Sequence, residues 1–293
     1  MPVSDSFIGV DGKNLRLWRW PHKPGRPTLH WAHATGFHAR LYQPLLDALS
    51  QHVNVIAWDA RGHGESRDVG DISRFNSWNI YYRDLAALIE QQPEPVWLAG
   101  HSFGAMTSMA AATLLRDKVA GVLLVEPVIV DRKTSLLVAT GKLFGQTHRL
   151  PIAAGAARRR ERFDTRQQAL DVYRRKSSFK GWQPGWLDHY VEHGFVDEEQ
   201  GVTLACRPAW EARSFSVMEH RPMKYARIFP QDKPLHILVG EKDSTFWPKA
   251  RLQLQQHIGH AQVDAFNGTS HFLPMEKPQQ LLNWIVNKLP LQD

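Results

Sequence analysis

The stretch Val96-Trp97-Leu98-Ala99-Gly100-His101-Ser102-Phe103-Gly104-Ala105-Met106 decides the fold. It begins with an apolar run typical of a buried strand and continues into a helical pattern that extends to residue 115. Between them lies a Gly-x-Ser-x-Gly motif, whose two glycines allow the sharp turn that raises Ser102 above the sheet edge at a helix start. A serine that merely caps a helix would leave both glycines unexplained. The segment therefore predicts a nucleophilic serine.

The same alternation of strand and helix extends along the chain in both directions. Expected strands are residues 28–34, 53–58, 95–100, 119–125, 235–239 and 262–266. Helical patterns cover residues 39–50, 78–91, 103–115, 247–258 and 278–289. Short apolar runs that alternate with amphipathic helices are typical of buried parallel strands with crossover helices, so the fold class is α/β. Near the start, two extended runs flank Asp11-Gly12 and predict a hairpin.

The alternation is interrupted by a long central segment. Residues 129–229 are polar, basic and rich in helix formers and aromatics, and no run among them is typical of a buried strand. We therefore expect one α/β core, made of residues 1–128 and 230–293, that is split by a mostly helical insertion at 129–229.

The composition excludes several classes of protein. Of the 293 residues, 43% are hydrophobic, which argues against a disordered chain. The longest apolar run, residues 119–130, contains Glu126 and is too short for a bilayer, which needs about 20 residues. The single cysteine, Cys206, excludes an intramolecular disulfide and a multi-cysteine metal site. With no signal-peptide pattern at the start, we expect a cytoplasmic protein without a membrane span.

The net charge of +7 is concentrated in the insertion. Residues 129–229 hold 18 Lys and Arg against 11 Asp and Glu, whereas the remainder of the chain is balanced. The charge is densest at Arg158-Arg159-Arg160-Glu161-Arg162. We interpret this run as a solvated helix face, with attraction of an anionic substrate or docking on an acidic surface as alternatives. No nucleic-acid-binding motif accompanies it, so we exclude a nucleic-acid partner.

A nucleophilic serine requires a base that accepts its proton and a carboxylate that orients the base. His271 follows the last expected strand and is thereby placed on a loop at the carboxyl end of the sheet. Among the 15 histidines, His260 also lies near that strand, but it precedes the strand. Position therefore selects His271 as the catalytic base.

Two carboxylates compete for the orienting role. Asp243 follows the strand at 235–239, and Glu126 ends the strand at 119–125, so both satisfy the order serine, acid, histidine. We favour Asp243 because a short loop after the penultimate strand would deliver it beside His271. Glu126 is the alternative acid, and Glu241 is a weaker third candidate.

Acyl transfer also needs hydrogen-bond donors for the developing oxyanion. One is the backbone N–H of Phe103, the residue after the nucleophile. The second is expected from the loop His33-Ala34-Thr35-Gly36-Phe37-His38, where the backbone N–H of Thr35 is our candidate. The two histidines of this loop have no third partner in sequence, so we expect no metal site.

These motifs resemble the α/β-hydrolase superfamily, in its serine-nucleophile branch with a helical lid, over the whole framework. The oxyanion loop of that family usually reads His-Gly-x-Pro, and here Ala34 replaces the glycine, which leaves open which N–H is the second donor. Asp59-Ala60-Arg61-Gly62-His63-Gly64-Glu65-Ser66 matches a structural turn of the family, which implies a structural role for His63. The run from His271 to Pro278 is similar to the sequence around the family's catalytic histidine.

The resemblance implies a mostly parallel sheet flanked by helices, with a helical cap inserted after the sixth strand. Such a cap roofs the active site and selects the substrate. Its aromatic side chains, some of which should face the pocket, are Trp182, Trp186, His189, Tyr190, His193, Phe195, Trp210 and Phe215. Cys206 is expected to be an inert residue of this cap.

The expected activity is hydrolysis of a small to medium, partly apolar carboxylic ester through an acyl-enzyme, without a cofactor. Related epoxide hydrolases and haloalkane dehalogenases carry Asp where Ser102 stands, so neither activity is expected. The same triad would also support cleavage of an amide, lactone, thioester or carbon–carbon bond, or perhydrolysis, and a slow-turnover ligand receptor is the alternative from another class. The partner is a small-molecule substrate, anionic if the arginines of the insertion face inward.

Overall fold

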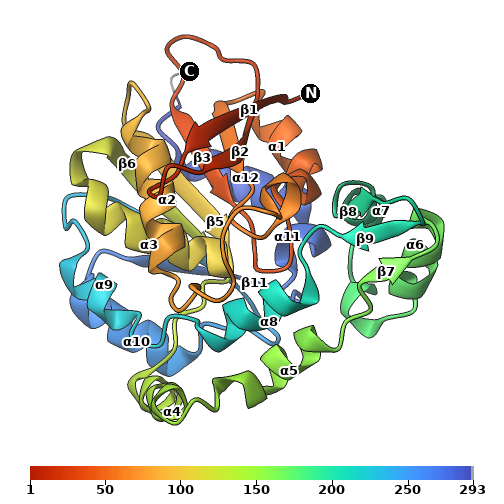
Figure 1. Cartoon of the computed structure of the whole chain (residues 1–293). Helices are drawn as coiled ribbons and strands as arrows, with labels where there is room; N and C mark the ends of the chain where they lie inside the picture. Colours follow the sequence, from red (N-terminus) through yellow and green to blue (C-terminus); the bar gives the residue numbers. More distant parts are fainter. Residues whose placement is uncertain (292–293) are drawn as a thin grey trace.

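The core of the protein is a single twisted sheet of eight strands with helices on both faces (Figure 1). The structure is a computed structural model and describes residues 1–291. Across the sheet the strands lie in the order β1 (Val3–Ile8), β2 (Asn14–Arg19), β4 (Asn54–Trp58), β3 (Thr28–Ala32), β5 (Val96–His101), β6 (Val119–Val125), β10 (Leu235–Gly240) and β11 (Gln262–Phe266). The predicted fold class is confirmed, and the predicted strand positions agree with these bounds to within a few residues.

The sheet is antiparallel only at its N-terminal edge. β1 pairs antiparallel with β2 around a turn at Gly12, which has a φ of 76°, as the Asp11-Gly12 pair predicts. β2 pairs antiparallel with β4, and every pair from β4 to β11 is parallel. The carboxyl ends of the six parallel strands therefore meet at one edge of the sheet, where α/β proteins place their ligands.

Two layers of helices cover the sheet and bury its apolar strands. One layer contains α2 (Asn79–Glu90), α3 (Phe103–Leu115) and α10 (Pro248–His257), and the other contains α1 (Gln43–Leu49) and α12 (Pro278–Lys288). Trp58 is fully buried on the first face and Trp31 on the second. No helix among residues 1–291 is long and apolar enough to cross a membrane.

The segment between β6 and β10 leaves the core and covers the carboxyl edge of the sheet (Figure 1). We call residues 129–229 the inserted segment. Its helices are α4 (Arg132–Leu143), α5 (Pro151–Ala157), α6 (Arg166–Arg174), α7 (Trp186–His193), α8 (Pro208–Ser216) and α9 (Met223–Ile228). It also contains a small antiparallel sheet in the order β7 (Arg162–Phe163), β9 (Val202–Leu204) and β8 (Phe195–Asp197). These strands of two or three residues are too short to give a recognisable periodicity.

The turn from β5 into α3 depends on the absence of two side chains. A Cβ atom at Gly104 would lie 2.2 Å from the carbonyl oxygen of Ala32, at the end of β3. A Cβ atom at Gly100 would lie 2.5 Å from the backbone of Gly104. Backbone atoms cannot be moved aside as flexible side chains can, so both glycines are required for α3 to pack this closely on the strands.

We expect Gly104→Ala to lower the free energy of unfolding by about 3 kcal/mol, because its methyl group collides with backbone at the end of β3. Gly155→Ala is the matched control. Gly155 lies inside α5 with no atom near the added methyl group, so this change should be neutral or stabilising by about 0.5–1 kcal/mol. Urea denaturation of both variants measures the difference. Equal stabilities would show that the turn from β5 into α3 tolerates a side chain at residue 104.

Candidate active site

Ser102 stands at the sharp turn between β5 and α3, as its motif predicts. Its φ of 59° and ψ of −116° are strained for a residue with a side chain. The residue is 8% exposed, and its Oγ lies 3.0 Å from Nε2 of His271. This distance suits transfer of the hydroxyl proton to the imidazole.

His271 lies on the loop after β11, and its second ring nitrogen is bound to a carboxylate. Nδ1 lies 3.1 Å from Oε2 of Glu126 and 3.4 Å from Oγ1 of Thr245. With Nδ1 donating to the carboxylate, Nε2 is free to accept from Ser102. The structure thus brings together Ser102, His271 and Glu126, the alternative acid, in one hydrogen-bonded series.

The hydrogen bonds of His271 favour Glu126 over Asp243, the acid that the sequence analysis preferred. Within residues 1–291, no hydrogen bond joins Asp243 to His271, although Asp243 lines the same cavity. The loop after β10 instead wraps around Glu126. The backbone N–H groups of Gly240 and Thr245 both donate to the Glu126 carboxylate, and Oγ1 of Thr245 donates to its backbone oxygen. The end of β10 and the loop after it therefore donate hydrogen bonds to Glu126, which follows the neighbouring strand β6.

These donors allow a charged group to remain in the interior. Glu126 is fully buried, has a φ of 51°, and follows β6, which lies between β5 and β10 in the sheet. A buried carboxylate requires hydrogen bonds to offset its lost hydration. Two backbone N–H groups and the His271 ring supply them. The carboxylate is held by the end of β10 with its following loop and by the loop after β11.

Both expected oxyanion donors border the cavity that contains Ser102. Phe103 is the first residue of α3, where backbone N–H groups have no partner within the helix. In the loop after β3, the N–H of Ala34 donates to the Tyr42 hydroxyl at 3.3 Å. The N–H of Thr35 stays the candidate second donor, and the structure leaves its role a prediction.

The loop after β3, which carries the candidate oxyanion donor Thr35, is anchored by a buried histidine. His33 is fully buried, and its Nδ1 lies 2.8 Å from the carbonyl oxygen of Ala34. Its Nε2 accepts from the backbone N–H of Ala60 at 3.0 Å. His63 is buried as well and stacks on the ring of Phe103, with centroids 6.3 Å apart. Both histidines hold the loops around the nucleophile in place.

A second series of hydrogen bonds, through Tyr42 and His101, joins the same loops. The residue types alone did not predict it. The Tyr42 hydroxyl lies 2.7 Å from Nδ1 of His101, the residue before Ser102. Nε2 of His101 lies 2.8 Å from the carbonyl oxygen of His271. Because Tyr42 also accepts from the N–H of Ala34, these hydrogen bonds link the loop after β3 to the backbone of His271. Burial lowers the pKa of His101 well below its ordinary value, so its ring is neutral.

Ser102 opens into a cavity of about 650 Å³, within the range of small-molecule sites. Most of its lining is apolar and comes from both the core and the inserted segment. These side chains are Phe37, Trp78, Phe103, Val128, Val130, Ile152, Tyr173, Phe179, Tyr190, Phe215, Met218, Trp247 and Phe272. Of the aromatics singled out in the inserted segment, only Tyr190 and Phe215 line the cavity, while Trp182, Trp186 and Trp210 are buried in packing.

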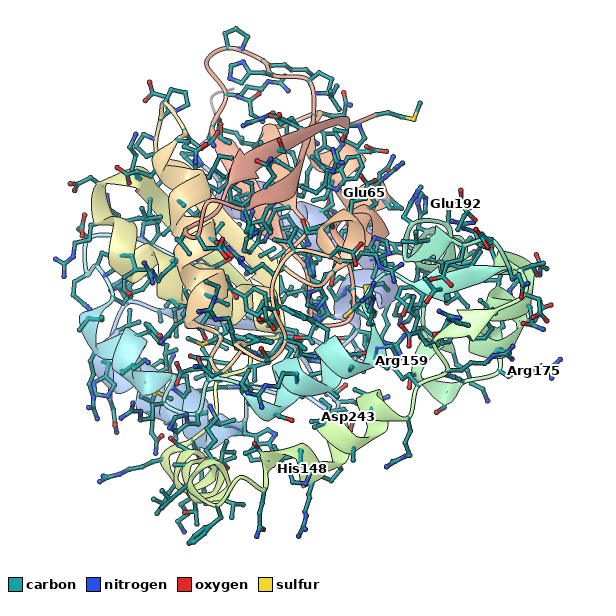
Figure 2. All side chains as sticks on the ribbon, viewed as in Figure 1. Glu65, His148, Arg159, Arg175, Glu192 and Asp243 are labelled. Atoms are coloured by element: carbon teal, nitrogen blue, oxygen red, sulfur yellow. The ribbon has the colours of Figure 1, made fainter. Side chains whose placement is uncertain are left out.

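One arginine of the dense basic run faces the cavity. Arg159 lies where α5 meets the small sheet (Figure 2) and pairs with Glu211. Its Nη2 also donates to the hydroxyl groups of Tyr190 at 2.5 Å and Tyr173 at 3.2 Å. Burial opposes the Arg159 charge, but these neighbours hold its pKa well above the ordinary value. Since Glu211 neutralises this charge, Arg159 by itself gives the cavity no net attraction for an anion.

Comparison with known proteins agrees with this architecture. Residues 29–284 match the profile of the Alpha/beta hydrolase family, and the chain belongs to that family. Over 148 residues it is 29% identical to monoglyceride lipase from Rattus norvegicus. That match covers 47% of this chain and 48% of the lipase, so the chain spans about half the length of the curated relative it matches.

Solved structures share the whole fold at low sequence identity. E-2-(acetamidomethylene)succinate hydrolase superimposes with a TM-score of 0.76 at 19% identity and 98% coverage of both chains. The thioesterase domain from the curacin biosynthetic pathway gives a TM-score of 0.77 at 18% identity, covering 98% of this chain and 99% of its own. The enol-lactonase from Burkholderia xenovorans LB400 gives 0.66 at 17% identity, covering 97% and 98%. Identities this low show the fold alone.

The buried histidines near the site predict a loss of stability in acid. Burial lowers the pKa of His30 to about 3, of His33 to about 4 and of His63 to about 3. In the unfolded chain each titrates near 6.5. Between these values the unfolded state binds more protons, so the free energy of unfolding should fall as pH drops from about 6 to 4.

His30→Phe tests this account, because both ring nitrogens of His30 are buried without a hydrogen-bond partner in the described structure. Removing this titrating group should make the pH dependence shallower by about 1.4 kcal/mol per pH unit. Urea denaturation of wild type and variant at several pH values measures the two slopes. Identical slopes would mean that His30 takes up its proton equally in the folded and unfolded states.

Proposed function

We propose that this chain is a serine hydrolase that cleaves small to medium carboxylic esters through Ser102, His271 and Glu126. The observation that carries the proposal is the hydrogen-bonded series of these three side chains, with the serine opening into an apolar cavity. Serine, histidine and a carboxylate in these roles are the recurring machinery of acyl transfer.

In the proposed reaction His271 takes the proton of Ser102 as Oγ attacks the ester carbonyl. The backbone N–H groups of Phe103 and Thr35 stabilise the oxyanion that forms. Glu126 stabilises the imidazolium, and His271 then gives its proton to the leaving alcohol. A water activated by His271 releases the acid from the acyl-enzyme. No step requires a cofactor.

The inserted segment acts in this proposal as the cap that selects the substrate. Side chains from α5, α7 and α8 line the cavity together with core residues around the triad. The mostly apolar lining favours an apolar acyl or alcohol group. Support comes from the names of similar proteins, which include a lipase, a thioesterase and an enol-lactonase.

Hydrolysis of p-nitrophenyl esters from acetate to dodecanoate tests the activity directly. A cavity of about 650 Å³ should favour esters between butyrate and decanoate over acetate. Wild type should hydrolyse many substrate molecules per enzyme molecule. In Ser102→Ala only the catalysis supplied by substrate binding and the oxyanion donors remains, so its kcat should be some thousandfold or more below that of wild type. Equal rates for the two proteins across the series would refute a serine hydrolase of esters.

The identity of the acid is tested by a pair of isosteric changes. Glu126→Gln should lower kcat by roughly a thousandfold, because His271 loses the carboxylate that orients it and stabilises its charge. Asp243→Asn should lower kcat by less than about tenfold, since Asp243 borders the cavity and, within residues 1–291, forms no hydrogen bond with His271. Circular dichroism melts check that both variants are folded. A larger loss in Asp243→Asn than in Glu126→Gln would return the role to Asp243.

A further inference from the structure

A second cleft, of about 580 Å³, lies beside the active-site cavity between α4, α9 and α10. Figure 1 shows these three helices gathered on one side of the inserted segment. Its lining is polar and strongly basic. The residues are Val130, Arg132, Ser135, Arg221, Met223, Lys224, Arg227, Gln253, Gln256 and His257. None of them is acidic, which distinguishes this cleft from the active-site cavity, whose lining includes Asp243 and Glu211.

Three of the four cations in the cleft have no counter-ion. Within the described residues, Arg132, Arg221 and Arg227 form no salt bridge, and only Lys224 is paired, with Glu219 at 3.1 Å. The other oxygen of Glu219 accepts from the backbone N–H of Arg221. The acid beside the cleft is therefore already engaged, and the guanidinium groups of the three arginines are available to a ligand.

Two cations of the cleft, Arg221 and Lys224, lie close to further basic groups beside its lining. Burial lowers the pKa of the Lys142 ammonium, Glu219 opposes that shift, and Lys224 and Arg221 add to it. The pKa of His220 is lowered by burial and then by Lys142, with Arg221 and Lys224 contributing and Glu219 opposing. Like charges held together raise the free energy of the empty site, and an anion bound among them would remove that repulsion.

The cleft is connected to the triad by one short stretch of chain. From Glu126 the backbone passes Val128, which lines the active-site cavity, then Val130, which lines both hollows, and reaches Arg132 in the cleft. Six residues span at most roughly 22 Å. The backbone of Arg132 therefore lies within roughly 22 Å of that of Glu126, and Val130 forms part of the wall of both hollows.

We propose that the basic cleft binds a phosphate group carried on the leaving side of the substrate. Several arginine forks around one hollow match the multiple oxygens of phosphate better than a single carboxylate. This inference rests on the proposed acyl hydrolysis. Ser102 Oγ bonds to the acyl carbon, the bond from that carbon to oxygen or sulfur breaks, and the phosphate-bearing alcohol or thiol leaves with the proton from His271. The uncharged acyl chain occupies the apolar cavity.

Two sources of such a phosphate are distinguishable by experiment. One is a lipid headgroup, represented by octanoyl glycerol phosphate, and the other is a soluble nucleotide thiol, represented by octanoyl coenzyme A. The neutral reference is p-nitrophenyl octanoate, which has the same acyl chain without phosphate. Whichever phosphate substrate has the higher kcat/KM identifies the source.

The test variant removes the three unpaired cations, Arg132→Ala, Arg221→Ala and Arg227→Ala together. The control removes three exposed arginines elsewhere, Arg74→Ala, Arg116→Ala and Arg175→Ala, so that both proteins lose the same charge. Arg175 lies at the outer edge of the inserted segment (Figure 2). We expect the ratio of kcat/KM for phosphate-bearing against neutral substrate to fall at least tenfold in the test variant only. Equal ratios in the two variants would overturn the proposal.

Calorimetric titration of pyrophosphate tests the cleft without relying on turnover. Both triple variants are made in the Ser102→Ala background. The Kd for pyrophosphate should then be at least tenfold higher in the test variant than in the control variant. Equal Kd values would contradict the cleft as a phosphate site, even if all esters are hydrolysed normally. Conversely, a wild type that binds pyrophosphate in the cleft but hydrolyses no ester would leave the site in place and refute the proposed function.

Discussion

The architecture of the site depends on the buried carboxylate of Glu126. It accepts hydrogen bonds from the backbone of Gly240 and Thr245 and contacts the ring of His271, so it joins the ends of β6 and β10 to the loop after β11. Because an unpaired buried charge is costly, all three segments are constrained to keep these bonds. The orientation of His271, and with it the distance to Ser102, follows from that constraint.

A second set of constraints holds the opposite side of the nucleophile. Gly104 lets α3 approach the end of β3, and His33 ties the oxyanion loop to the backbone after β4. The chain from Ala34 through Tyr42 and His101 to the carbonyl of His271 then connects that loop with the base. The loop after β3 and the series of Ser102, His271 and Glu126 are thus positioned by one continuous polar network, which in the proposed reaction is a form of preorganisation before any substrate binds.

Much of this could be predicted from the sequence because it rests on periodicity and on glycine spacing. The strands, the elbow at Ser102 and the position of His271 are visible in residue types alone. The residue types alone could not identify the acid that contacts His271, because Asp243 and Glu126 both follow strands and both satisfy the order serine, acid, histidine. The deciding factor is the path of the loop after β10, whose N–H groups point at Glu126, and backbone direction leaves no mark in the side chains. The sequence likewise could not predict that Arg159 faces the cavity, since only the tertiary structure shows its partner Glu211.

A crystal structure of the protein after reaction with an alkyl phosphonate ester would test the central claim most directly, because the adduct imitates the tetrahedral intermediate. We predict phosphorus bonded to Oγ of Ser102, a phosphoryl oxygen within 2.7–3.1 Å of the N–H groups of Phe103 and Thr35, and Nδ1 of His271 on Glu126. A His271 ring turned to Asp243, or phosphorus bonded to a different side chain, would contradict the account.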